Sequence, residues 1–249
     1  MNLIEQLTNF KGKKLLIGGH RGNLSDIREN TIKNFEQVLN SGICHIEIDV
    51  QLTKDDVAVI YHDLELSQKT SLCGMIRDYT LEELNKSFEI NTLDEVLEWS
   101  KANNQTVALE IKSRPLDMSS YMSILGEKIA ESIINFDFYD MCFVFSTDYS
   151  VLTQIKNIDK RINIGLIVPI VPVDPVKLME DMDAIIYLCY IDNLSKEIVD
   201  KLHSSGYYVD GSVINTEDRL KKALEIGVDL IESDYPLEIL KIYGGLSDS

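Results

Sequence analysis

Strand-like apolar runs recur along this chain, and most of them are separated by segments with a helical pattern. The nine runs cover residues 14–19, 45–50, 57–62, 106–112, 141–146, 162–168, 184–188, 207–213 and 228–233. Strands that alternate with helices indicate a parallel sheet, because each parallel connection needs a crossover that a helix usually supplies. The pattern therefore predicts an α/β fold.

One junction departs from this alternation. Only residues 51–56 separate the runs 45–50 and 57–62, which is too short for a parallel crossover. We interpret the second run as an excursion in which the chain turns at residues 54–56 and returns toward the end it left. Counting the excursion with its parent strand leaves eight parallel strands, the number that a closed TIM (β/α)8 barrel requires. A length of 249 residues also suits one such barrel.

Helix starts are marked by capping signals. Thr80 and Thr92 each begin a Thr-x-x-Glu pattern, which is typical of a capping box, and Thr216 begins another helix. Asn30 is expected to cap a helix that ends at Gly42. These boundaries place helices after the first, second and seventh predicted barrel strands.

We expect one domain spanning residues 1–249, since no repeat, low-complexity tract or linker interrupts the chain. The segment at about 64–89 is unusually long for a connection between neighbouring elements. We interpret it as a small insertion after the second strand, lying over one end of the barrel, where lids and specificity loops are commonly found.

Composition limits the classes of function. A net charge of −17 argues against nucleic-acid binding, and an anionic substrate would need a local positive site. The apolar runs are too short, or too rich in proline, for a membrane span, and residues 1–14 lack the order of a signal peptide. A cytoplasmic protein is therefore expected. The widely spaced cysteines are expected to be buried thiols: Cys44, Cys73, Cys142 and Cys189.

Polar residues gather where the predicted strands end, which is where the active sites of parallel barrels lie. Four segments contribute them: His20, Arg21, Glu47, Asp49, His62, Glu110 and Lys112. Glu47 and Asp49 lie two apart on one strand, and residues two apart share a face. The excursion would return His62 to the same rim.

The three carboxylates of this set, Glu47, Asp49 and Glu110, offer the oxygen ligands that Mg²⁺ or Ca²⁺ prefers, with Mn²⁺ as a further candidate. Like charges this close repel unless positive charge lies between them. The alternative from the residues alone is a set of core ion pairs with Arg21 and Lys112 and no metal. Buried pairs of that kind are seldom retained for stability alone, which favours the metal.

The remaining residues suit phosphodiester cleavage. Arg21 and Lys112 are suited to bind phosphoryl oxygens, Arg21 through its planar fork and Lys112 as a point charge. His20 and His62 allow one general base and one general acid near neutral pH. Asp63 is expected to orient His62 rather than to take part in the chemistry.

Five short motifs resemble the glycerophosphodiester phosphodiesterase family in order and spacing: HRG at 20–22, ENT at 29–31, EID at 47–49, HD at 62–63 and EIK at 110–112. The resemblance implies a TIM barrel, one divalent metal, and hydrolysis of a small glycerophosphodiester to glycerol phosphate and an alcohol. It makes His20 and His62 the acid–base pair. It also implies a route in which the neighbouring glycerol hydroxyl attacks phosphorus and water then opens a cyclic phosphate.

The chain departs from the family pattern at three positions. Arg28 replaces a proline, Ser212 replaces a tryptophan that would form an apolar wall, and Glu232 replaces an apolar residue. Two alternatives therefore stay open. The first is a lysophospholipase D-like enzyme, which a basic or apolar membrane-facing loop would favour. The second is a catalytically silent barrel that binds phosphorylated ligands or a partner, although both histidines and all three carboxylates are retained.

Overall fold

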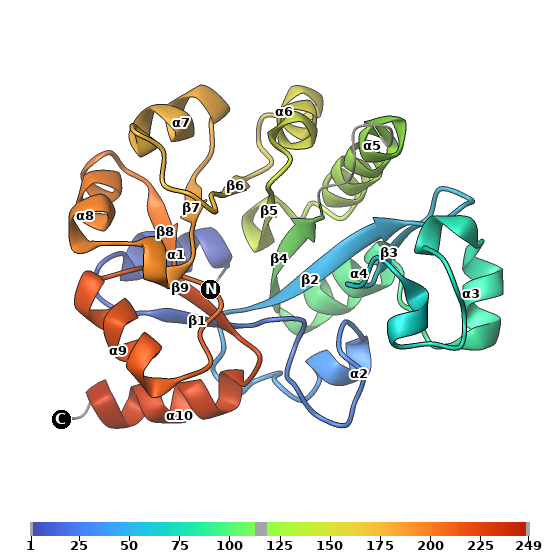
Figure 1. The fold of residues 1–249 in the computed structure, drawn as a ribbon, viewed down its shortest axis with the longest axis horizontal. Coiled ribbons are helices and arrows are strands. Elements are labelled where there is room, and N and C mark those ends of the chain that lie inside the picture. Colours follow the sequence, from blue (N-terminus) through green and yellow to red (C-terminus); the bar gives the residue numbers. More distant parts are fainter. Residues whose placement is uncertain (1, 113–118, 248–249) are drawn as a thin grey trace.

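The computed structural model describes residues 2–112 and 119–247 and forms a ring of parallel strands surrounded by helices (Figure 1). Neighbouring strands pair around the ring in chain order, and β9 pairs with β1 to close it. The ring consists of β1 (Leu16–Gly19), β2 (His45–Leu52), β4 (Thr106–Ile111), β5 (Cys142–Ser146), β6 (Ile164–Ile167), β7 (Ile186–Leu188), β8 (Tyr208–Asp210) and β9 (Leu230–Ser233). The predicted TIM barrel is confirmed.

The excursion after β2 is confirmed as well. Strand β3 (Ala58–Ile60) pairs antiparallel with the end of β2, with Val50 opposite Ile60. The chain reverses at residues 54–56, where Asp56 takes a positive φ of 58°. The strand therefore lies outside the ring and carries the following residues back to the rim where β2 ends.

Helices cover the outside of the ring and fill one of its ends. They are α1 (Leu3–Phe10), α2 (Ile32–Phe35), α3 (Leu81–Ser87), α4 (Leu93–Asn103), α5 (Ser119–Asn135), α6 (Tyr149–Ile158), α7 (Pro175–Met182), α8 (Lys196–Ser204), α9 (Glu217–Ile226) and α10 (Pro236–Ser247). Leu3 and Leu7 of α1 pack with inward-facing residues such as Leu230 and Phe143, so α1 closes the end where the strands begin. The opposite end, where the strands finish, stays available for a site.

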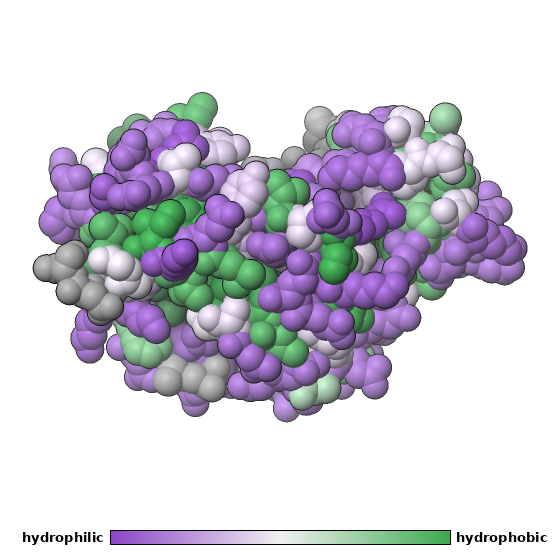
Figure 2. Space-filling model, turned by 90° about the horizontal axis from the view of Figure 1, so that it is seen from below, coloured by the Kyte–Doolittle hydropathy of each residue, from purple (hydrophilic) through white to green (hydrophobic). Residues whose placement is uncertain are grey.

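Outward from the ring, the surface is mainly hydrophilic. Figure 2 views the molecule from the side of α10 and shows hydrophobic patches within a hydrophilic surround. Leu237 of α10 and Leu224 of α9 are among the large apolar residues that remain over one-third exposed. Scattered exposure of this extent is ordinary for a folded protein.

Capping was predicted correctly for three helices and wrongly for one. The side chains of Thr80, Thr92 and Thr216 accept hydrogen bonds at the starts of α3, α4 and α9. The cap of α2 is Thr31, not Asn30, and α2 ends at Phe35 instead of continuing to Gly42. Asn30 has a φ of 55°, and its side chain is bound to an acid of the barrel, so it cannot cap the helix.

The segment 64–89 holds two short 3-10 helices, η1 (Leu66–Gln68) and η2 (Ile76–Asp78), together with α3. Its apolar residues form a cluster of their own with Val59 and Tyr61, separate from the main core. That the segment is an insertion into a single domain stays a prediction. The expectation that all four cysteines are buried is wrong, because Cys73 in this segment is exposed.

Two more 3-10 helices, η4 (Tyr139–Met141) and η5 (Ile191–Asn193), precede β5 and follow β7.

Candidate active site

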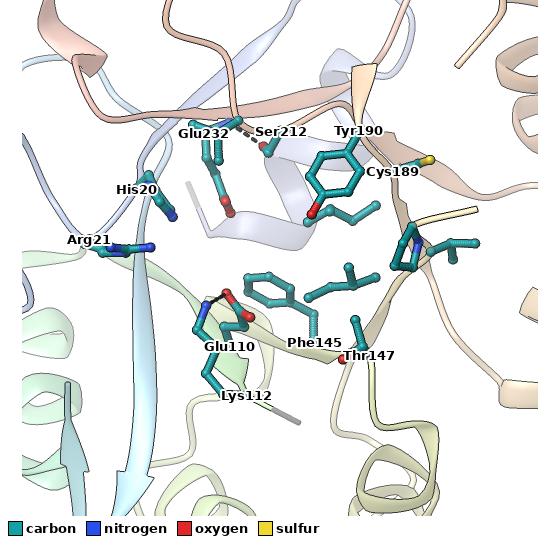
Figure 3. A pocket seen from close by; sticks show the side chains of 15 residues that line it. His20, Arg21, Glu110, Lys112, Phe145, Thr147, Cys189, Tyr190, Ser212 and Glu232 are labelled. Atoms are coloured by element: carbon teal, nitrogen blue, oxygen red, sulfur yellow. Dashed lines mark hydrogen bonds and ion pairs between the residues drawn. The ribbon is translucent and has the colours of Figure 1, made fainter. Parts of the chain in front are cut away.

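A cavity of about 320 Å³ opens at the end of the barrel where the strands finish (Figure 3). Residues one or two positions beyond the ends of six strands line it: His20, Lys112, Thr147, Val168, Cys189 and Ser212. Its lining has a charged wall, which includes Arg21 and Glu110, and an adjoining apolar wall, which includes Phe145 and Ile167. This division suits a ligand with an anionic group joined to a carbon skeleton.

His20 is held by an acid from the last strand. Its Nδ1 donates to Asp234 Oδ1 over 2.6 Å, and this hydrogen bond lowers the pKa of Asp234. Asn215 donates to the other oxygen of Asp234 over 2.6 Å. With Nδ1 engaged, His20 directs Nε2 toward the acids of the barrel, 4.0 Å from Glu47 Oε2.

Sequence reasoning missed Asp234, although a signal for it was present. The acid follows directly after the last strand, and ring closure pairs that strand with the first, with Gly19 opposite Ser233. A closed barrel therefore places residue 234 beside residue 20. The pair spans 214 positions in sequence, so only the topology brings the two side chains together.

The loop after β1 turns sharply to bring Arg21 over the acids. Arg21 has a φ of 57°, and its backbone N–H donates to Glu47 Oε2 over 2.9 Å. A side chain at Gly19 would collide with the backbone of Gly22, so the turn requires glycine there. The Arg21 side chain lies 3.4 Å from Asp49 Oδ2, so backbone and side chain each hold one acid of the barrel.

Glu47, Asp49 and Glu110 form the acidic cluster of the site, with one oxygen from each lying within 4.8 Å of the others. Glu47 and Asp49 are fully buried. Lys112 Nζ lies 2.8 Å from Asp49 Oδ1 and 2.6 Å from Glu110 Oε2. Asn30, the predicted helix cap, instead donates to Asp49 Oδ2 over 2.8 Å.

These contacts leave Glu47 as the least compensated acid of the cluster. Burial, followed by the charges of Asp49, Glu232 and Glu110, raises the pKa of Glu47 well above its usual value. For Asp49, burial acts in the same direction but Lys112 and Arg21 overcome it and lower the pKa. Within the described part of the chain, Glu47 Oε1 has no hydrogen-bond partner.

The cluster therefore fits a hard divalent cation. The ion-pair alternative accounts for Asp49 and Glu110, which both contact Lys112, but it leaves Glu47 buried beside other acids. A buried carboxylate without a compensating charge is costly, and a cation beside it removes that cost. The donor set is entirely oxygen, as Mg²⁺, Ca²⁺ or Mn²⁺ prefers.

His62 lies at the same rim but does not belong to the residues that line the cavity. Its Nδ1 donates to Asp63 Oδ1 over 2.7 Å, as expected of an orienting acid. Gln51 donates to the backbone carbonyls of Tyr61, His62 and Asp63, which fixes this return of the chain. His62 follows Lys112 and Arg21 among the groups that lower the pKa of Asp49 against the effect of burial, so the histidine lies near the acidic cluster.

Barrel, cavity and acidic rim together define a phosphoric diester hydrolase. The model of the Glycerophosphoryl diester phosphodiesterase family matches residues 20–238, and the chain belongs to this family. A relative from Bacillus altitudinis, named Glycerophosphodiester phosphodiesterase, is 31% identical over 241 residues, covering 91% of this chain and 97% of the relative.

Two further similarities bear on the site. A solved Oleispira antarctica phosphodiesterase, in complex with the product sn-glycerol-3-phosphate, has a TM-score of 0.84 and 26% identity, covering 94% of this chain and 97% of its own. A lysophospholipase D of Homo sapiens is 23% identical, covering 88% of this chain and 83% of the relative. Among the described residues, we find no helix with the length and apolar character that crossing a membrane requires.

Proposed function

We propose that this chain hydrolyses glycerophosphodiesters to glycerol 3-phosphate and an alcohol, with a divalent metal and the acid–base pair His20 and His62. The observation that carries the proposal is the convergence at one end of the barrel of a carboxylate-held histidine, two cations and an acidic cluster in which Glu47 is buried without a compensating charge. Family membership supports the same chemistry.

In this mechanism Glu47, Asp49 and Glu110 would hold the metal. A metal bound there would supply Lewis-acid polarisation of a phosphoryl oxygen and would offset the negative charge that develops on it. Arg21 and Lys112 lie on the charged wall and bind the remaining phosphoryl oxygens.

The histidines move the protons. One histidine accepts the proton of the neighbouring glycerol hydroxyl as that oxygen attacks phosphorus, and the other protonates the departing alcohol. The roles reverse when water opens the cyclic phosphate. Asp234 holds His20 and Asp63 holds His62, each through Nδ1, so both rings keep Nε2 for this exchange.

The test is release of glycerol phosphate from glycerophosphocholine and glycerophosphoethanolamine in EDTA, and then with Mg²⁺, Mn²⁺ or Ca²⁺ restored. We expect no turnover in EDTA and recovery with at least one metal. His62→Ala should abolish turnover and leave metal binding nearly intact, whereas His203→Ala, at the far end of the barrel, should change neither. Turnover that persists in EDTA would contradict the metal-dependent site.

A second candidate function has one observation in its favour. The loop after β6 exposes Ile170 at 84% and Val173 at 104%, and it adjoins cavity residues Val168 and Pro169. Tyr190, which follows the neighbouring strand β7 and also lines the cavity, is 58% exposed. An apolar lip of this kind would receive the acyl chain of a lysophospholipid, the substrate type named for the human relative.

This candidate is tested by comparing lysophosphatidylcholine with glycerophosphocholine. If the lip serves an acyl chain, the double variant Ile170→Ser with Val173→Ser should lose turnover of the lysolipid and keep turnover of glycerophosphocholine. Equal effects on both substrates would exclude it.

A further inference from the structure

Glu232 places a carboxyl group inside the cavity at a barrel position where an apolar residue would otherwise be expected. The residue is 2% exposed and lines the cavity together with His20 and Glu110. Figure 3 shows its side chain reaching into the open space across from Glu110. The mechanism above gives it no part.

The carboxyl is supported from behind by a fully buried histidine. Glu232 Oε1 lies 3.3 Å from Nε2 of His45, which begins β2. The ring of His45 lies against Gly18, where any side chain would collide with it. On the other side of Glu232, Ser212 Oγ accepts the Glu232 backbone N–H over 2.6 Å and donates to Asp210. His45 therefore holds the side chain of Glu232, and Ser212 holds its backbone.

Neither a purely structural role nor metal binding accounts for this arrangement. The neighbouring inward-facing residue on β9 is Leu230, and an apolar side chain at 232 would need no partner. Glu232 is also absent from the group of acids whose oxygens converge within 4.8 Å. Within residues 2–112 and 119–247, no hydrogen bond reaches its second oxygen, Oε2, so this atom is left for a ligand.

We propose that Glu232, backed by His45, binds a hydroxyl group of the substrate portion that enters this cavity, and thereby selects a polyol phosphate over an equivalent without hydroxyls. The inference rests on the proposed function. Lys112 and Arg21 would hold the phosphate on the charged wall, and the apolar wall would contact the carbon skeleton. Glu232 lies between the two, where a hydroxyl one or two carbons from the phosphate would reach it.

Ser212 makes this contact possible. Its small side chain stands where the family resemblance implies a tryptophan, and its hydroxyl is already engaged with Asp210 and the backbone of Glu232. A bulky ring at this position would cover the carboxyl. The two unusual residues, Ser212 and Glu232, thus form one polar feature of the cavity instead of two unrelated substitutions.

The experiment compares binding of sn-glycerol 3-phosphate and propyl phosphate, measured by calorimetry in Mg²⁺, for the natural chain, Glu232→Gln and Glu232→Leu. The natural chain should prefer the hydroxylated ligand. Glu232→Leu should reduce that preference about tenfold, the effect of losing one hydrogen bond of about 1.4 kcal/mol to a carboxyl group. Glu232→Gln should reduce the preference by less, because an amide can still form a hydrogen bond with a hydroxyl group.

Asp229→Asn is the matched control, since it alters another histidine-bound acid at the opposite end of the same strand. It should leave the preference unchanged. If both Glu232 variants kept the preference for sn-glycerol 3-phosphate, the inference would be overturned. A fall in the Mg²⁺ affinity of these variants would also overturn it, because Glu232 would then be a metal ligand. If the natural chain cleaves no glycerophosphodiester but the preference depends on Glu232, the proposed function fails and this inference stands.

Discussion

The two ends of β9 carry the same chemical pair in opposite settings. Just before the strand, Asp229 bonds to His203 over 2.7 Å, and just after it, Asp234 bonds to His20 over 2.6 Å. Asp229 is buried, at 2% exposure, whereas the side chain of Asp234 is 34% exposed.

The partners of each acid explain the difference. Asp229 also accepts the backbone N–H groups of Val209 and Gly12, at 2.8 and 3.2 Å, so it fastens three segments of chain together. Asp234 is instead held by two side chains, those of His20 and Asn215, and its histidine faces the cavity. A histidine–carboxylate pair stabilises the fold where backbone groups complete it, and it serves a site where the second ring nitrogen faces open space.

The largest expected effect follows from removing the rim histidine. His20→Asn should lower kcat for a glycerophosphodiester by roughly 10³-fold, the range of a lost general acid or base, and leave the free energy of unfolding within about 1 kcal/mol. Steady-state kinetics and urea unfolding measure the two. The matched variant His203→Asn should give the reverse pattern, and a similar loss of activity in both would remove the distinction between the two ends.

Removing the uncompensated acid of the rim should have the next largest effect. Glu47→Gln should lower turnover roughly 100-fold by weakening metal binding, yet should not destabilise the metal-free protein. Because burial and nearby acids raise the pKa of folded Glu47, its contribution to stability is complete below the usual glutamate pKa and is lost as pH rises toward the raised value.

The stability of the natural chain, relative to Glu47→Gln, should therefore fall as pH rises above about 4.3. Urea unfolding in EDTA across this range is the measurement. A relative stability that rises with pH would show that Glu47 is ionised and compensated in the folded protein.

Asp234→Asn should lower activity by less, because it leaves His20 in place but weakens the contact that orients its ring. An amide can present its NH₂ group to Nδ1, which favours the tautomer with the proton on the wrong nitrogen. We expect kcat to fall roughly tenfold with little change in KM. Asn215→Ala removes only the second hydrogen bond to Asp234, so its kcat should lie between the values for Asp234→Asn and the natural chain.

The sequence predicted much of the site because strand ends and two-residue spacing determine where side chains point. Parity within a strand pairs Glu47 with Asp49 and Glu110 with Lys112, strand ends suggest that the two pairs meet, and the structure brings the four residues together. Asn30 could not be placed in this way, since its contact with Asp49 depends on a left-handed turn that the sequence analysis read as a helix cap.

The interior pair of His45 and Glu232 was beyond prediction for a different reason. Its members are 187 positions apart. Taken alone, His45 is only a residue at the start of β2, and Glu232 is only an acid at an apolar position of β9. Their meeting depends on strand stagger, which determines which residues of non-adjacent strands share a layer inside the barrel. The stagger cannot be read from periodicity.

The smallest effect on activity is expected at the other end of β9, from Asp229→Asn. The carboxylate accepts from Gly12 with one oxygen and from Val209 and His203 with the other, and an amide offers only one acceptor. At least one buried N–H must then face an NH₂ group, which should cost about 1–3 kcal/mol of stability while kcat stays within about twofold. If instead kcat fell as far as in Asp234→Asn, a change at the start of β9 would be affecting the site at its other end. The two histidine–carboxylate pairs would then be coupled through the strand and would not act independently.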